Sequence, residues 1–265
     1  MPRYFCGGPF GEVNYNTVGA RFADSVWSPQ MRIKDVDFPQ AVLAAQRSGK
    51  LVLFAGAGVS IPPPSNLPNF RDLAKRVASG ALTREEDEPS DRFLGRLHAQ
   101  GIQVHRIVSE ILRDPTSAPN ELHSILLQLF PRANDVRLVT TNFDTHFSTA
   151  AATLYGSSEG IEFHHAPALP LGDRFSGIVY LHGSINKPAE RLVLTDADFG
   201  RAYLTEGWAR RFLQGLFAQY TVLFVGYSHE DVVLQYLARG LPPDPGAGGR
   251  FALTPKGKEQ HWKYL

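Results

Sequence analysis

Five short, predominantly apolar runs recur along the chain, and segments whose apolar residues have helical spacing separate them. The runs cover residues 51–55, 135–141, 177–182, 220–225 and 250–254. Runs of this kind are typical of strands that are buried on both faces. Their alternation with helical segments predicts an α/β fold, in which helices cover both faces of a parallel sheet.

The same pattern predicts how the chain is divided. Residues 1–36 show no clear period, so we interpret them as an irregular N-terminal arm. We expect the main domain at 37–255, with a mostly helical insertion at about 80–131, and the start of a C-terminal extension or linker at 256–265. Helices are predicted at 38–48, from Asn66 or Pro68 to about Val77, and at 91–100, 102–113 and 121–130, the last with Asn120 as its N-cap.

Glycines and polar residues stand where four of the predicted strands end. In chain order they are Gly56, Ala57 and Gly58, then Asn142, His182 and Gly226. In parallel sheets, ligands bind outside the carboxyl ends of the strands. We therefore predict that these residues meet in one site.

The turn that follows the first strand favours a pyrophosphate ligand. A strand that ends in Gly-Ala-Gly can present bare backbone N–H groups to an anion at a helix N-terminus. The match covers only the first half of a dinucleotide fingerprint, because Ile61 stands at the third glycine position. A purely structural turn is the alternative interpretation.

Asn142 and His182 each allow two interpretations. Asn142 is either the N-cap of the next helix or a neutral amide that holds a ribose hydroxyl or a water molecule. His182 is either a structural residue or a base that works near neutral pH. Gly183, directly after it, favours the second interpretation, since glycine lets a ligand approach closely. The other histidines show no metal-ligand spacing, and most are interpreted as surface residues.

Composition narrows the possible partners and the compartment. The net charge is +1, so no basic face for nucleic acid is expected. No apolar run is long enough to span a membrane, and the N-terminus lacks the apolar segment of a signal peptide, so we expect a cytoplasmic protein. Cys6 is the only cysteine, which argues against a Cys-based zinc site and a disulfide within the chain.

Five motifs in a fixed order resemble the sirtuin family. They are Gly-Ala-Gly-Val-Ser at 56–60, Leu-Pro-Asn-Phe-Arg at 67–71, Thr-Thr-Asn-Phe-Asp at 140–144, Leu-His-Gly-Ser at 181–184 and Val-Gly-Tyr-Ser at 225–228. The set is far more specific than any one member, and the resemblance covers roughly residues 45–255. It implies a Rossmann-like, sirtuin-type domain that binds NAD.

The resemblance also implies a role for each matching residue. The pyrophosphate would be lined by Gly56, Ala57, Gly58 and Ser60, and the cofactor-binding loop would hold Phe70 and Arg71. Thr141 stands where sirtuins carry Gln beside the nicotinamide ribose. Asn142 matches the asparagine that holds ribose and water, Asp144 the residue that grips the nicotinamide carboxamide, and His182 the catalytic base. On the adenosine side are Gly226 and Ser228, with Tyr227 replacing Thr.

The chain departs from sirtuin deacylases because it lacks the four zinc cysteines that follow their catalytic histidine. It is closer to sirtuin-like domains of bacterial antiphage systems, which destroy NAD and act with another module. The resemblance thus implies an NAD hydrolase that uses NAD as its substrate, binds no zinc, and forms a homo-oligomer or joins a partner defence protein. An NAD-dependent protein deacylase or ADP-ribosyltransferase, and a non-catalytic module that senses NAD or ADP-ribose, are the alternatives.

Overall fold

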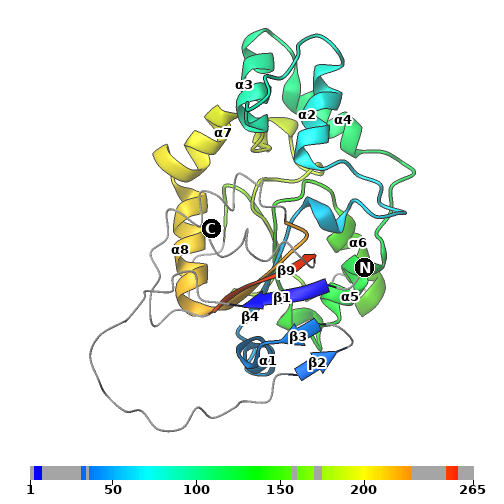
Figure 1. Cartoon of the computed structure of the whole chain (residues 1–265), viewed down its shortest axis with the longest axis vertical. Coiled ribbons are helices and arrows are strands. Elements are labelled where there is room, and N and C mark those ends of the chain that lie inside the picture. Colours follow the sequence, from blue (N-terminus) through cyan, green and yellow to red (C-terminus); the bar gives the residue numbers. More distant parts are fainter. Residues whose placement is uncertain are drawn as a thin grey trace.

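A seven-stranded sheet forms the centre of the described chain. The computed structural model describes residues 3–7, 31–33, 36–156, 160–169, 175–227 and 249–255. Within these ranges the strand order is β1-β9-β8-β4-β5-β7-β6 (Figure 1). The strands are β1 (Arg3–Gly7), β4 (Leu51–Ala55), β5 (Arg137–Thr140), β6 (Phe163–His165), β7 (Gly177–Tyr180), β8 (Thr221–Val225) and β9 (Arg250–Pro255).

Strand β4 lies in the middle of this sheet, with β8 on one side and β5 on the other. The pairs β4–β8, β4–β5, β5–β7, β6–β7 and β8–β9 are all parallel. Ala55, the last residue of β4, is in register with Thr140 of β5 and Val225 of β8. Three strands therefore end at the same edge, and the loops that leave them start side by side.

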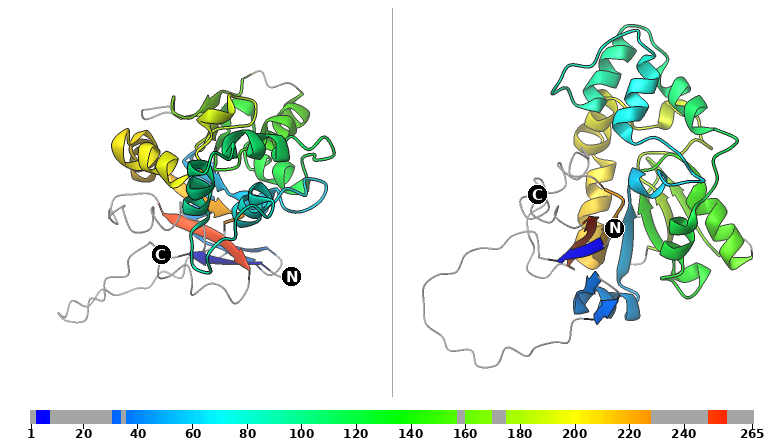
Figure 2. Two further views of the ribbon diagram at one scale, coloured as in Figure 1. Left: turned by 90° about the horizontal axis from the view of Figure 1, so that it is seen from above. Right: turned by 45° about the vertical axis from the view of Figure 1, so that its right-hand side comes forward.

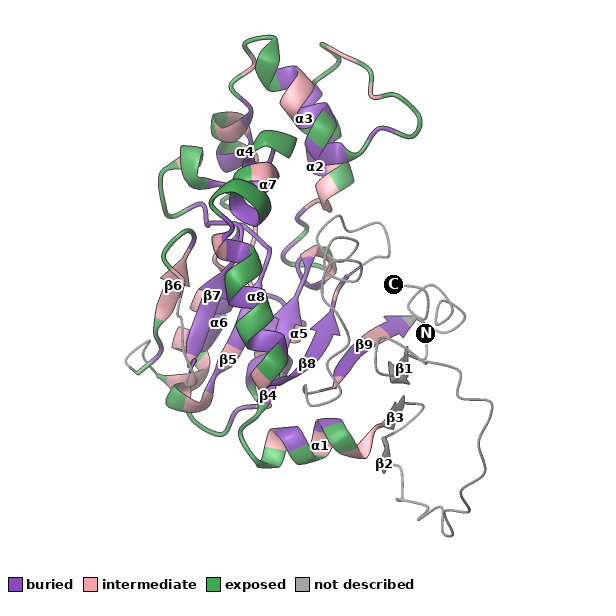
Figure 3. Ribbon diagram, turned by 90° about the vertical axis from the view of Figure 1, so that its left-hand side faces the viewer, coloured by how far each residue is buried: buried purple, intermediate pink, exposed green. Residues whose placement is uncertain are grey.

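Helices cover both faces of the sheet, as the apolar runs predict. Leu53 faces a cluster that includes α1 (Gln40–Arg47), α5 (Glu121–Leu127) and α6 (His146–Tyr155). Phe54, the next residue, faces the opposite cluster, to which α8 (Trp208–Gln219) contributes. All five residues of β4 and of β8 are buried (Figure 3). The predicted α/β, Rossmann-like fold is confirmed.

Three further helices form what we call the helical lobe: α2 (Phe70–Ala78), α3 (Ser90–Ala99) and α4 (Val104–Leu112). They stand together at one end of the sheet (Figures 1 and 2). Their apolar cluster includes Phe143 and Ile185, which follow β5 and β7. The lobe thus packs on the loops at the carboxyl ends of the strands. Of the helices within 80–131, α3 and α4 belong to the lobe, whereas α5 packs against the sheet.

The described parts of residues 1–36 differ from the irregular arm that the sequence predicts. Residues 3–7 form β1, which pairs antiparallel with β9 at the sheet edge. Residues 31–33 form β2 (Met31–Ile33), which pairs with β3 (Val36–Phe38). A strand added at a sheet edge is held by backbone hydrogen bonds, which leave no clear apolar period.

Two other expectations concern the ends of the domain and membranes. Residues 256–265, interpreted as an extension, lie outside the described residues. Among the helices in the described ranges, none is long and apolar enough to cross a membrane.

Candidate functional site

A cavity of about 1000 Å³ lies where the strand ends meet the helical lobe. Loops that follow β4, β5, β7 and β8 line it, together with the start of α2. Among its lining residues are ten that the sequence singles out: Ala57, Gly58, Ser60, Phe70, Arg71, Thr141, Asn142, Asp144, His182 and Gly226. Four separate loops therefore converge on one cavity, as the strand-end argument predicts. Ser228 lies outside the described residues.

The Gly-Ala-Gly turn is held against the loop after β8. The Gly56 N–H donates to the Val225 carbonyl (2.9 Å), and the Gly58 N–H donates to the Gly226 carbonyl (2.8 Å). A Cβ atom added to Gly58 would lie 2.7 Å from the Gly226 oxygen, so only glycine allows this approach. Gly226 itself has a φ of 74°, in the left-handed region.

This packing corrects the expectation of several bare N–H groups at the turn. Val59 and Ser60 donate within a short 3-10 turn, Ala57–Val59, which stands where a helix start is expected. Together with the two glycines, four N–H groups of this stretch are used inside the fold. Within residues 56–60, only the Ala57 N–H has no acceptor among the described residues. The main role of these glycines is therefore to let the loops after β4 and β8 approach each other closely.

The Ser60 hydroxyl is the centre of a buried polar network. It donates to Asp144 Oδ2 (2.9 Å) and accepts from Asn142 Nδ2 (3.1 Å). Its third neighbour is His123 Nε2, at 3.2 Å. A hydroxyl has one proton and two lone pairs, so these three contacts saturate it. Ser60 thus fixes Asn142 and Asp144, although the resemblance implies a contact to pyrophosphate.

His123, from α5, completes this network inside the fold, whereas most of the histidines other than His182 are predicted to lie on the surface. The His123 side chain is fully buried. Burial lowers the pKa of His123 to about 4, although the negative charge of Asp144 acts to raise it. The single Ser60 proton is directed at Asp144, so His123 Nε2 carries the imidazole proton and donates to Ser60, while Nδ1 accepts from the Asn120 N–H (3.2 Å). Asn120 caps α5 as predicted. A histidine at the third position after a predicted N-cap was the one sequence signal for this role.

Asn142 lines the cavity and has an unused acceptor in its side chain. Its side chain is 5% exposed, and its Oδ1 atom is buried without a hydrogen-bond partner among the described residues. Helix α6 begins only at His146, after Thr145, so Asn142 does not cap it. A buried amide oxygen without a partner is costly unless a ligand or water fills the place. This geometry fits an amide that holds a hydroxyl group.

Asp144 keeps its carboxylate in place through two contacts. Oδ1 accepts from the His146 N–H (3.0 Å), and Oδ2 accepts from Ser60. Each carboxylate oxygen has a further lone pair, so Asp144 can still accept from a ligand. His146 is also buried, with Nε2 at 2.8 Å from the Ser117 hydroxyl.

His182 lies at the end of β7 and is 3% exposed. Its Nε2 atom is 2.9 Å from the hydroxyl of Tyr203, and the ring of Phe199 meets its ring edge-on at 5.1 Å. Burial lowers the pKa of His182 to about 3, so the imidazole is neutral at pH 7. Gly183 has a φ of 89°, and its missing Cβ would face the Arg191 carbonyl rather than a ligand.

Two loops meet through Thr141 and Tyr227. The Thr141 hydroxyl is 2.8 Å from the Tyr227 hydroxyl, which also donates to the Ala55 carbonyl (3.3 Å). The ends of β4, β5 and β8 are therefore joined by one tyrosine. From the sequence, Tyr227 is only a replacement for Thr, and nothing in its local pattern predicts this role.

Phe70 and Arg71 open α2, which begins two to four residues later than the sequence predicts. Asn69 caps the helix, accepting from the Asp72 N–H (2.8 Å). The Phe70 ring lies 6.5 Å from that of Phe199, so it borders the surroundings of His182. Arg71 is exposed at the cavity wall.

Metal ligands do not gather at this site. Across the described ranges we find no group of three or more His, Cys, Asp or Glu residues that could hold a metal ion. The polar side chains that line the cavity include the Asn142 amide, the Asp144 carboxylate, the His182 imidazole and the Thr141 hydroxyl.

Comparisons with known proteins agree with the fold and the motifs. Residues 136–264 match the family model described as the SIR2-like domain. Over 231 residues, 78% of this chain, the sequence is 32% identical to "Uncharacterized protein y4cA" of Sinorhizobium fredii. Over 212 residues, also 78% of this chain, it is 27% identical to "NAD(+) hydrolase ThsA" of Cytobacillus dafuensis. The aligned regions span 19% and 41% of those proteins, so the chain covers less than half of either relative.

The family match begins at β5 and includes the loops that carry Asn142 and His182. The parallel sheet and the order of the five motifs point the same way. Residues 136–264 of this chain therefore match a SIR2-like domain, and over that part the resemblance to the sirtuin family is confirmed.

Proposed function

We propose that this domain hydrolyses NAD at the nicotinamide–ribose bond, releasing nicotinamide and ADP-ribose. The observation that carries the proposal is the buried, unpartnered Oδ1 of Asn142, a residue that lines one cavity together with Asp144 and the neutral His182. The SIR2-like match and the printed name of the ThsA relative support NAD as the substrate. By the same resemblance, the proposed role is antiphage defence through NAD depletion.

The proposed chemistry needs little acid catalysis at the leaving group. The bond from C1′ to the pyridinium nitrogen breaks with its electron pair moving onto that nitrogen, so nicotinamide leaves neutral and unprotonated. Positive charge then develops at C1′, as in other glycosyl transfers. Positioning and electrostatic stabilisation supply most of the rate in such a reaction.

Each polar residue has a place in this scheme. Asp144 accepts a hydrogen bond from the nicotinamide carboxamide and contributes negative charge near C1′. The Asn142 amide oxygen orients a ribose hydroxyl or the attacking water. The His182 imidazole accepts the proton that the water loses as its oxygen bonds to C1′. A weak base is sufficient, because water that bonds to a cationic carbon becomes strongly acidic.

The test is nicotinamide release by Asn142→Ala and His182→Ala variants of the full chain. We expect each to lose about 10²–10³ in rate, the range for one transition-state contact. Asn134→Ala and His98→Ala are matched controls, because both residues are exposed and lie outside the cavity. Full activity in both site variants would remove the proposed mechanism.

The same assay separates the alternatives. NAD consumption that depends strictly on an added acylated peptide would indicate a protein deacylase. Calorimetric binding of NAD without any turnover would indicate a sensing module. Mass spectrometry of NAD incubated with the protein, alone and with candidate partners, distinguishes these outcomes.

A further inference from the structure

The two ring nitrogens of His182 have different surroundings. Nε2 meets the Tyr203 hydroxyl at 2.9 Å, whereas we find no hydrogen-bond partner for Nδ1 among the described residues. Since Tyr203 covers Nε2, Nδ1 is the nitrogen that remains open to a ligand in the cavity lined by His182.

The position of one proton decides whether such a histidine can act as a base. A neutral imidazole carries one proton, and its other nitrogen carries a lone pair. With the proton on Nδ1, the Nε2 lone pair is taken up by the tyrosine O–H, and no acceptor remains for substrate. With the proton on Nε2, the ring donates to the tyrosine oxygen, and the Nδ1 lone pair is free.

Tyr203 lies in an unusual segment that fixes its direction. Residues Arg201–Thr205 form a π-helical turn between α7 (Asp196–Gly200) and α8. The Glu206 N–H donates to the Arg201 carbonyl (3.0 Å), five residues back. The extra residue rotates the side chains that follow it, and single π turns are often found at functional sites. The Tyr203 ring stacks on the Phe199 ring, with 6.0 Å between the ring centres. Phe199 in turn packs against the His182 ring.

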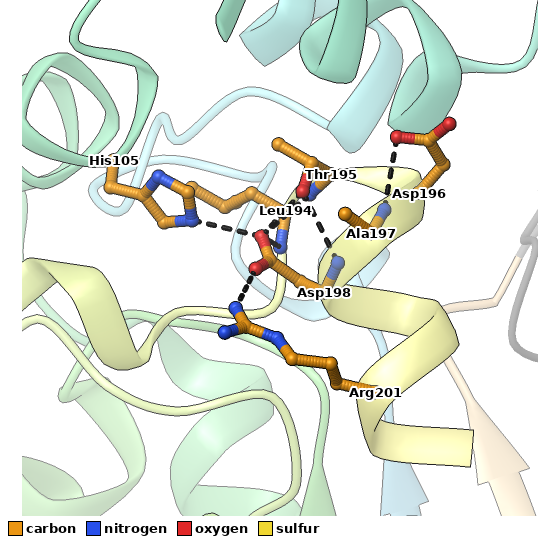
Figure 4. Close-up of polar contacts among 7 residues, drawn as sticks. All are labelled: His105, Leu194, Thr195, Asp196, Ala197, Asp198 and Arg201. Carbon is orange, nitrogen blue, oxygen red and sulfur yellow. Dashed lines mark hydrogen bonds and ion pairs between the residues drawn. The ribbon is translucent and has the colours of Figure 1, made fainter. Parts of the chain in front are cut away.

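Asp198, next to Phe199, anchors this segment to the helical lobe (Figure 4). Its Oδ2 accepts from His105 of α4 (2.8 Å) and from the Thr195 N–H (2.9 Å) and hydroxyl (2.8 Å), and Oδ1 accepts from Arg201. Burial disfavours the charged carboxylate, but the hydrogen bonds from His105 and Thr195 outweigh it and hold the pKa well below its usual value. Asp198 is therefore a charged anchor, and α7 cannot shift without breaking it.

We propose that Tyr203 is the positioning residue of His182, accepting a hydrogen bond from Nε2–H and so leaving the Nδ1 lone pair as the proton acceptor. The inference rests on the proposed function, because it assigns the tautomer that a base needs. Tyr203 lies outside the five motifs, and the π turn that carries it would thereby have a role at the site.

The kinetic test is Tyr203→Phe, which keeps the ring and removes only the hydroxyl. We expect kcat for nicotinamide release to fall about tenfold or more, because loss of a tautomer-fixing partner costs up to about 10⁴ in other enzymes. KM should stay within about twofold, since Tyr203 is not among the residues that line the cavity. Tyr155→Phe is the matched control: its hydroxyl donates to the Leu127 and Phe130 carbonyls on the other face of the sheet. Unchanged kcat in Tyr203→Phe would overturn the proposal.

A second measurement, of the His182 tautomer itself, does not depend on enzymatic activity. In ¹⁵N-histidine-labelled protein at pH 7, the nitrogen shifts report the tautomer of each ring, and His182→Gln identifies the signals of His182. We expect Nε2–H in the wild type and a mixture of tautomers in Tyr203→Phe. Nδ1–H in the wild type, or one tautomer in both proteins, would overturn the proposal. A chain that forms the Nε2–H tautomer but never releases nicotinamide would instead contradict the proposed function and leave the role of Tyr203 standing.

Discussion

At the scale of single residues, the Ser60 hydroxyl holds the two polar side chains that the proposed chemistry needs. Asn142 and Asp144 lie on the loop after β5, while Ser60 follows β4 and His123 comes from α5. One oxygen atom therefore connects three parts of the chain. A buried network of this kind is stabilising only when every member has its partner.

We expect His123→Phe to lower the free energy of unfolding by about 1–3 kcal/mol, the cost of leaving buried polar groups unsatisfied. The His123 imidazole packs against Phe147, with 4.8 Å between the ring centres, and a phenyl ring can take its place there. The phenyl ring can, however, neither donate a hydrogen bond to Ser60 nor accept one from the Asn120 N–H. Urea unfolding measures the change. His98→Phe, at an exposed position, should change stability by less than about 0.5 kcal/mol. Equal stability of wild type and His123→Phe would show that the network does not need the imidazole.

At the scale of elements, the site depends on the close approach of the loops after β4 and β8. Parallel pairing brings Ala55 and Val225 into register, and the two glycine-containing turns then touch. A Cβ added to Gly226 would lie 2.7 Å from the Val59 nitrogen, which is backbone and cannot move alone. The turn after β4 therefore takes its shape from its neighbour as much as from its own sequence.

Gly226→Ala should accordingly cost more stability than backbone strain alone. A left-handed conformation costs a residue with a side chain about 1–2 kcal/mol. Gly80→Ala isolates that cost, because Gly80 has a φ of 82° and its added Cβ meets no atom within 4 Å. We expect the free energy of unfolding of Gly226→Ala to lie at least about 1 kcal/mol below that of Gly80→Ala, since overpacking typically costs 1–3 kcal/mol. Identical thermal and urea unfolding of the two variants would argue against tight packing of the loops.

At the scale of the whole molecule, buried neutral histidines make stability depend on pH. Burial lowers the pKa of His182 to about 3 and that of His123 to about 4. In the unfolded chain a histidine titrates near pH 6.5. Between these values the unfolded state binds more protons, so stability is complete above about pH 6.5 and is lost as the pH falls.

We expect the free energy of unfolding to fall between pH 6.5 and 4.5, by up to about 1 kcal/mol per pH unit for each of these two histidines. His182→Gln should flatten the slope by the share of one histidine, while His98→Gln should leave it unchanged because His98 is exposed. Urea titrations at half-unit intervals of pH measure the slopes. The same slope in wild type and His182→Gln would mean that His182 does not stay neutral in the folded protein.

The strands and their ends could be predicted from sequence because both leave local signals. Apolar runs mark the strands of a parallel sheet, and the residues after them must lie at one edge. Asn142 and His182 are therefore predicted to meet at that edge, and the sirtuin resemblance adds Asp144; all three line the cavity. The glycines of the first turn are also found this way, although their close contact with Gly226 is not.

The residues that support the site leave no such signal. His123, Tyr203 and Tyr227 act through side chains that meet partners far away in the sequence. A buried histidine and a surface histidine have the same local pattern, and only the tertiary contacts separate them. A π turn likewise depends on packing between neighbouring helices, and so Tyr203 could not be assigned to His182 in advance.

Because the turn at residues 56–60 is held by Gly226, it cannot reach its final packing early in synthesis of the protein. Residues 56–60 leave the ribosome early, but the carbonyl that receives the Gly58 N–H and the hydroxyl that meets Thr141 belong to Gly226 and Tyr227. Domains complete their packing only when the required elements have emerged. Under the proposed activity, we therefore expect a nascent copy that still lacks β8 to leave the NAD pool of its cell intact.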